Sequence, residues 1–165
     1  MLKLVHCYRL SAIGFLALFC SWVLAQPIAL KPFTFESYQQ ILEDHAMQPF
    51  MLVIWSIDCP SCVKDMALIE QIHQNQPELK IVMLSTDDVS ASEQIEKILQ
   101  QNHLADLENW VFADTNSQKL RYQIDPKWYG ELPRTYFFDA AHHREGISGV
   151  LSQEKLDAQL KRALK

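Results

Sequence analysis

The sequence predicts an α/β fold in which helices flank both faces of a mixed central β-sheet. Three observations indicate this fold. Apolar runs of strand length alternate with amphipathic helical patterns through the first two thirds of the chain. Two strand patterns then follow one another across a short turn, which is typical of an antiparallel hairpin. The part of the chain that carries these patterns has the length of one domain.

The pattern begins with a helix over residues 35–46, "FESYQQILEDHA". Ser37 is its expected N-cap, and Gln40, three residues on, completes a capping box. The continuous apolar run 49–57, "PFMLVIWSI", then predicts a strand covered on both faces. A second helix is expected over 62–74, because its apolar residues recur at helical spacing.

A second covered strand is expected over 79–86, "LKIVMLST". The acidic pair at 87–88 is interpreted as a turn leading into the next helix. That helix is predicted over 90–104, where Ser90 and Glu93 have the spacing of a capping box.

The rest of the chain continues the alternation and then changes it. Ser152 is the expected cap of the last helix, whose final turn carries basic residues that suit the helix dipole. His142 and His143 fall at the turn of the predicted hairpin and are interpreted as solvated residues, not ligands. The predicted elements are a strand at 109–114, a helix at 117–124, a hairpin of 134–140 with 145–151, and a helix at 152–165.

Residues 1–25 have the composition of a secretory signal peptide. A weakly basic start precedes the apolar run 10–25, and the small residues Val23 and Ala25 favour cleavage after Ala25. The run is short for a membrane span, so membrane attachment is expected only if the segment stays uncleaved. The expected organisation is therefore a signal peptide, 1–25, and one domain, 26–165, in the periplasm or otherwise exported.

The charge of the mature domain excludes some classes of partner. Lys3 and Arg9 are the only charged residues of the signal segment, so its removal leaves 13 basic and 20 acidic residues and a net charge of −7. No basic stripe is present, so a nucleic-acid partner is not expected. An anionic membrane surface gains no support either.

The cysteines are the strongest chemical signal. Cys7 and Cys20 leave with the signal peptide, so the exported domain keeps Cys59 and Cys62 in a compartment where disulfides persist. A disulfide that encloses two residues constrains the unfolded chain very little. A purely structural role is therefore the weaker interpretation.

The position of this pair favours redox chemistry. Cys59 lies where a covered strand passes into a helix, and Pro60 occupies the first helical position. There the unpaired N–H groups and the helix dipole stabilise a thiolate and lower the pKa of Cys59. Cys62, one turn later, can close a disulfide with it as the more buried, resolving sulfur.

These residues resemble a known family. "IWSIDCPSC" (54–62) is similar to the active-site strand and loop of the thioredoxin superfamily, and most of all to exported TlpA/ResA-like thiol–disulfide oxidoreductases. Trp55, four residues before Cys59, matches an aromatic position of that pattern, although the side chain is expected in the core. The resemblance spans residues 33–165 and implies a thioredoxin-like fold.

A second segment, "ELPRTYFFD" (131–139), resembles the family's cis-proline strand. The resemblance implies that Pro133 is a cis-proline packed against the cysteine pair. It also implies that Leu132 offers backbone groups to an extended substrate. Trp128 and Tyr129, in the longer "DPKWYGE" approach (125–131), are expected either to line the substrate groove or to pack the loop.

Three features modulate the expected chemistry. Asp58 stands where many thioredoxins have Trp, and its carboxylate would raise the pKa of Cys59. Val53 replaces the buried acid of cytoplasmic thioredoxins, so that acid's role as a base cannot be transferred. Pro60 and Ser61, between the cysteines, are expected to tune the reduction potential.

The predicted function is thiol–disulfide exchange with protein disulfides or dithiols, with Cys59 attacking and Cys62 resolving. Asp58 and the family tendency favour a reductase that receives electrons from a membrane or periplasmic donor. No cofactor and no metal are expected.

Two alternatives stay open. Two thiolates could carry Cu(I), a soft ion that suits them. The domain could also be a redox-inactive, peptide-binding relative with the same fold.

Overall fold

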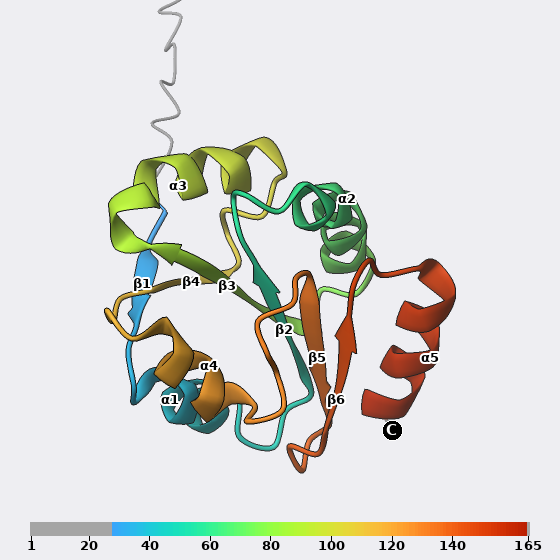
Figure 1. The fold of residues 1–165 in the computed structure, drawn as a ribbon. Coiled ribbons are helices and arrows are strands. Elements are labelled where there is room, and N and C mark those ends of the chain that lie inside the picture. Colours follow the sequence, from blue (N-terminus) through green and yellow to red (C-terminus); the bar gives the residue numbers. More distant parts are fainter. Residues whose placement is uncertain (1–27, 165) are drawn as a thin grey trace, which may run out of the picture.

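A computed structural model describes residues 28–164 (Figure 1). The predicted signal peptide and its cleavage point lie outside the described residues. Within them, no helix is both long and apolar enough to cross a membrane. The elements in chain order are β1 (Leu30–Phe33), α1 (Ser37–Asp44), β2 (Phe50–Trp55), α2 (Pro60–Asn75), β3 (Lys80–Asp88), the 3₁₀ helix η1 (Val89–Ala91), α3 (Ser92–Gln101), β4 (Glu108–Phe112), α4 (Ser117–Ile124), β5 (Arg134–Phe138), β6 (Arg144–Ser148) and α5 (Gln153–Ala163).

The strands form one mixed sheet in the order β1-β4-β3-β2-β5-β6. The first four of these are parallel to one another, whereas β5 runs antiparallel to β2 and β6 antiparallel to β5. The two kinds of pairing confirm the predicted mixed sheet. They also place β2, which leads to Cys59, directly beside β5, which follows Pro133.

Helices cover both faces of the sheet, as predicted (Figure 1). On one face α2, α3 and α5 pack with the sheet into a core cluster that includes Met66, Leu99 and Leu156. On the other face α1 and α4 form a second cluster through Ile41 and Leu120. Every residue of β2 is buried, because this central strand is covered on both sides.

The N-terminal strand β1 is an element that the sequence analysis missed. It has four residues, includes Pro32, and lies at the edge of the sheet, where it pairs with β4 alone. An edge position is where a strand tolerates proline. The short, interrupted pattern therefore gave no strand signal.

Two predicted capping boxes are wrong. Ser37 is the first residue of α1 and is buried, where its hydroxyl approaches the Thr34 N–H and the Pro32 carbonyl oxygen. Ser90 lies inside η1, which Asp88 caps by accepting from the Ser90 N–H. By contrast, the Ser152 hydroxyl does accept from the Lys155 N–H and caps α5 as predicted.

The hairpin turn also differs from its interpretation. His142 is half-buried, with its Nε2 at 3.0 Å from the His45 carbonyl oxygen and its ring edge-on to Phe50 and Phe138. It is thus a packing residue and not a solvated one. His143 is exposed and pairs with Asp139 at 3.0 Å.

A carboxylate at the start of β4 makes the stability of the fold depend on pH. Glu108 is bonded to His45 (3.0 Å), Lys31 (2.7 Å) and Trp110 (2.8 Å). The His45 bond contributes most to lowering the pKa of Glu108 from 4.5 to about 2. Because the pKa of Glu108 is lower in the folded state, its ionised form stabilises the fold at pH values above the unfolded-state pKa of 4.5. That stability is lost as the pH falls from 4.5 toward 2.

We therefore expect Glu108→Gln to lower the free energy of unfolding at pH 7 by about 1–2 kcal/mol. This is less than the full pKa shift of Glu108 implies, because Glu108 and its charged partners are partly exposed to solvent. Urea unfolding at pH 7 and near pH 2 measures this. The two proteins should differ at pH 7 and converge in acid. An equal difference at both pH values would contradict the assignment.

Candidate active site

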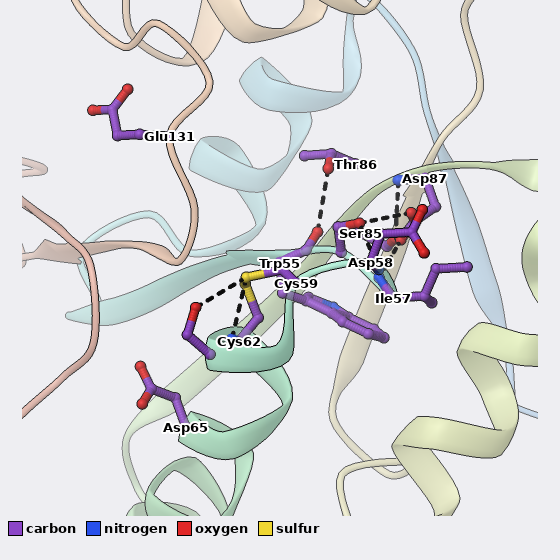
Figure 2. Close-up of a disulfide and its surroundings, with 12 residues drawn as sticks. Trp55, Ile57, Asp58, Cys59, Cys62, Asp65, Ser85, Thr86, Asp87 and Glu131 are labelled. Atoms are coloured by element: carbon purple, nitrogen blue, oxygen red, sulfur yellow. Dashed lines mark hydrogen bonds between the residues drawn. A yellow bond between two sulfur atoms is a disulfide. The ribbon is translucent and has the colours of Figure 1, made fainter.

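The cysteine pair lies at the N-terminus of α2, at the carboxyl end of the central strand β2 (Figure 2). Cys59 is the N-cap residue, with φ −111° and ψ 93°, and Pro60 follows at the first helical position. The Cys59 Sγ accepts a hydrogen bond from the Cys62 N–H at 3.2 Å. The sulfur thus occupies the position where unpaired helix N–H groups stabilise a negative charge.

Cys59 and Cys62 form a disulfide, with their Cα atoms 5.2 Å apart. Cys62 is only 2% exposed, whereas Cys59 is half-buried. Ser61 lies between them, and its Oγ is 3.4 Å from the Cys59 sulfur. Because Cys59 is the more accessible sulfur, an incoming thiol or disulfide meets it first.

The Leu132–Pro133 peptide bond is cis, the isomer that the resemblance implied. Pro133 is buried and borders the same small cavity as Cys62 and Asp65. Leu132 is half-buried and, like Cys59, packs on the edge of the first core cluster. The two segments singled out in the sequence therefore meet at one place in the fold.

Asp65 is the residue near the cysteines that the sequence analysis missed. It lies on α2 three residues after Cys62, is 5% exposed, and accepts from the Leu151 N–H at 3.0 Å (Figure 2). Burial raises the pKa of Asp65, against the Leu151 bond and the Lys64 charge, which lower it. The i, i+3 spacing from Cys62 was the available signal, because it puts both side chains on one helix face.

Comparison with solved structures connects this geometry to known proteins. A secreted Mycobacterium tuberculosis disulfide oxidoreductase homologous to E. coli DsbE superposes with a TM-score of 0.59 at 19% identity, over 73% of this chain and 85% of that one. The thioredoxin domain of a Bacteroides vulgatus thiol–disulfide oxidoreductase gives a TM-score of 0.57 at 15% identity, over 75% and 84%. A thioredoxin family protein from Chlorobium tepidum, a thiol:disulfide interchange protein, gives 0.57 at 13%, over 75% and 85%.

The chain has a thioredoxin-like fold. This confirms the predicted fold class. No protein-family model and no curated protein matches the sequence. At the identities found, the likeness establishes the architecture alone.

Within the thioredoxin-like domain, the loop before Pro133 is tied down by ion pairs. Asp125 accepts from the Tyr136 hydroxyl at 3.0 Å and pairs with Arg134 (3.3 Å) and Arg144 (3.4 Å). The Tyr136 hydroxyl and both arginines come from the hairpin strands β5 and β6. The network thus fixes the start of the loop to the hairpin that follows it.

The two aromatic residues of this loop have different surroundings. Trp128 is 4% exposed in the second core cluster, and its indole N–H donates to the Glu131 carbonyl oxygen at 2.9 Å. It therefore packs the loop, which is the second of the two roles expected for it. Tyr129 is 91% exposed and stays a candidate for contact with a substrate.

The remaining predicted modulators also have clear positions. Trp55 is 1% exposed in the core beneath the cysteines. Asp58 is exposed, directly before Cys59, and its N–H donates to the Ser56 hydroxyl at 3.1 Å. Its predicted effect on Cys59 rests on this proximity.

Over residues 28–164, no group of three or more His, Cys, Asp and Glu side chains is arranged to hold a metal ion.

Proposed function

We propose that this protein is an exported thiol–disulfide oxidoreductase that reduces disulfides in other proteins. The observation that carries the proposal is a half-buried sulfur, Cys59, capping α2 and bonded to the buried Cys62 beside Pro133. The structural neighbours described as disulfide oxidoreductases support the activity, and the secreted neighbour supports export. The signal-peptide pattern of residues 1–25 supports export independently.

The reaction begins with the reduced pair. The Cys59 thiolate attacks one sulfur of a substrate disulfide, forms a mixed disulfide, and releases the other substrate sulfur as a thiolate that takes up a proton. Cys62 then loses its proton and attacks the Cys59 sulfur. That step releases the second substrate thiolate and leaves Cys59–Cys62 oxidised. Two electrons have passed to the substrate, and a donor dithiol restores the pair by the reverse exchange.

The buried thiol needs a base in the second step, and Asp65 supplies one. Asp65 borders the same cavity as Cys62, a space of about 10 Å³ that holds one water molecule at most. A carboxyl group with a raised pKa takes up a proton more readily than an ordinary one. Asp65 thus provides the function that Val53 cannot.

The site also favours the reducing direction. Asp58 adjoins Cys59, so its carboxylate opposes formation of the Cys59 thiolate. A less stable thiolate makes the reduced state a better electron donor, as the contrast between thioredoxin and strongly oxidising relatives shows. Leu132, Pro133 and Tyr129 form the expected contact surface for the substrate chain.

The direct test is stoichiometric transfer. Fully reduced protein is mixed with disulfide-bonded insulin, free thiols in both proteins are alkylated, and their masses are measured by mass spectrometry. We expect each protein molecule to lose two hydrogens through Cys59 and Cys62 while insulin gains one pair of free thiols. A pair that dithiothreitol reduces but that transfers no electrons to insulin or to other protein disulfides would contradict the proposal. Copper bound at one equivalent after anaerobic purification would favour the metal-carrier alternative.

A further inference from the structure

The strand beside the active-site strand contains a bulge at the level of the cysteine loop. In the pairing of β3 with β4, Ser85 lies opposite Val111, but the next pair is Asp88 with Phe112. Thr86 and Asp87 are therefore extra residues on β3. Bulges of this kind redirect side chains and are common beside active sites.

Both bulge residues turn toward the end of β2 (Figure 2). The Thr86 hydroxyl donates to the Trp55 carbonyl oxygen at 3.4 Å. The Asp87 carboxylate accepts from the Ser56 hydroxyl at 2.8 Å and from the Ile57 N–H at 2.9 Å. The three residues that β3 holds are thus the last residue of β2 and the first two residues of the loop that leads to Cys59.

The hydrogen bonds continue from Asp87 to Cys59 along the backbone. The Ser56 hydroxyl, oriented by Asp87, accepts from the Asp58 N–H at 3.1 Å. The Ser56 carbonyl oxygen accepts from the Cys59 N–H at 3.2 Å. A second contact holds the carboxylate itself, because the buried Ser85 hydroxyl donates to it.

We propose that Asp87 is a positioning residue for the attacking sulfur. It holds the turn before Cys59 so that the sulfur stays in line with the Cys62 N–H. The proposal rests on the proposed function and adds a residue to it that the sequence analysis interpreted as part of a simple turn. Asp87 touches neither sulfur, so its effect passes through Ser56 and the backbone of residues 57–58.

Positioning and charge make opposite predictions for removal of Asp87. If the carboxylate acts through geometry, its loss frees the loop, weakens the bond from the Cys62 N–H, and raises the pKa of Cys59. If it acts through its negative charge, its loss lowers that pKa. Besides Asp87, Figure 2 labels three carboxylates in the surroundings of the disulfide: Asp58 on the loop of Cys59, Asp65 on α2 and Glu131 before β5. The Lys64 charge acts on Asp65.

The experiment is alkylation of Cys59 by iodoacetamide between pH 5 and 10, in a Cys62→Ser background. For Asp87→Ala we expect alkylation at pH 7 to slow by about fivefold, because the pKa of Cys59 rises toward the ~8.5 of a free thiol. Asp87→Asn can still accept from the Ile57 N–H and contact Ser56, so it should stay within about twofold of the parent. Alkylation that is unchanged or faster in Asp87→Ala would overturn the proposal.

Asp88→Ala is the matched control, because it removes a carboxylate at the neighbouring position. The Asp88 side chain caps η1 and does not hold the cysteine loop. It should leave alkylation unchanged. If Asp87→Ala does not fold, Ser56→Ala removes the link from Asp87 through the Ser56 hydroxyl to the Asp58 N–H and must slow alkylation. No effect there would also overturn the proposal. Alkylation needs no protein substrate, so a failure of insulin reduction by the parent protein is seen separately.

Discussion

Replacing Cys59 with Ser is expected to lower the rate of insulin-disulfide reduction to that of the uncatalysed reaction. A hydroxyl cannot form the mixed disulfide, and the buried Cys62 is too enclosed to replace Cys59 as the attacking sulfur. The measurement is the initial rate of insulin-chain precipitation with dithiothreitol as donor. Thermal unfolding of the same variant, compared with the dithiothreitol-reduced parent, shows whether the fold is kept.

Cys62→Ser is the matched variant, because it keeps the attacking sulfur and removes the resolving one. It should form mixed disulfides through Cys59 that persist until a thiol is added. The same variant, expressed in cells, would identify substrate proteins by the chains linked to Cys59. Equal insulin reduction by the parent and by Cys59→Ser would contradict the roles given to the two sulfurs.

Asp65→Asn is expected to slow the second step of the exchange by about a hundredfold, since the Cys62 thiol then lacks its base. The first step, attack by Cys59, should change little. Rapid mixing of reduced protein with a peptide disulfide, followed by acid quenching and mass spectrometry, resolves the two steps. The mixed disulfide should accumulate in the variant and stay below detection in the parent. The difference should narrow at alkaline pH, as the thiol begins to ionise without a base.

The same substitution should leave the protein equally stable or more stable. Burial raises the pKa of Asp65 in the folded state, so its ionisation costs stability as pH rises above the unfolded value of 3.8. Asn removes that cost, and its carbonyl oxygen can still accept from the Leu151 N–H. A higher melting temperature together with slower resolution would mark Asp65 as a residue kept for function.

Glu70→Gln provides the control for Asp65→Asn, because it removes a carboxylate from the same helix. Glu70 accepts from Gln74 on the exposed side of α2. It should alter neither step. Slow resolution in both variants would point to the helix charge, and normal resolution in Asp65→Asn would remove the base from the mechanism.

Much of the fold was predictable because its strongest local patterns are also its central elements. β2 is a continuous apolar run, and all of its residues are buried because the core covers both faces of this strand. The helix 117–124 was predicted with the bounds that α4 has. The short edge strand β1 was not predicted, because four residues with a proline carry no periodic signal.

The site was predictable only where one segment carries the chemistry. Cys59, Pro60 and Cys62 form such a segment, so their place at a strand-to-helix junction followed from sequence. Asp87 acts through a bulge in the next strand, and a bulge depends on strand pairing that local sequence does not reveal. Asp65 reads as one polar position of an amphipathic helix until the cavity beside Cys62 is seen.

The reduction potential of the Cys59–Cys62 pair decides whether this disulfide exchanges electrons with other proteins. It is obtained by equilibrating the protein in dithiothreitol or glutathione buffers of set ratio and counting free thiols by alkylation. A reducing, redox-active pair predicts reversible titration with a potential between about −200 and −270 mV, the range from glutaredoxin-like to thioredoxin-like pairs. A potential below about −300 mV, typical of structural disulfides, would contradict the claim that this pair exchanges electrons, and one near about −120 mV would reverse the assigned direction.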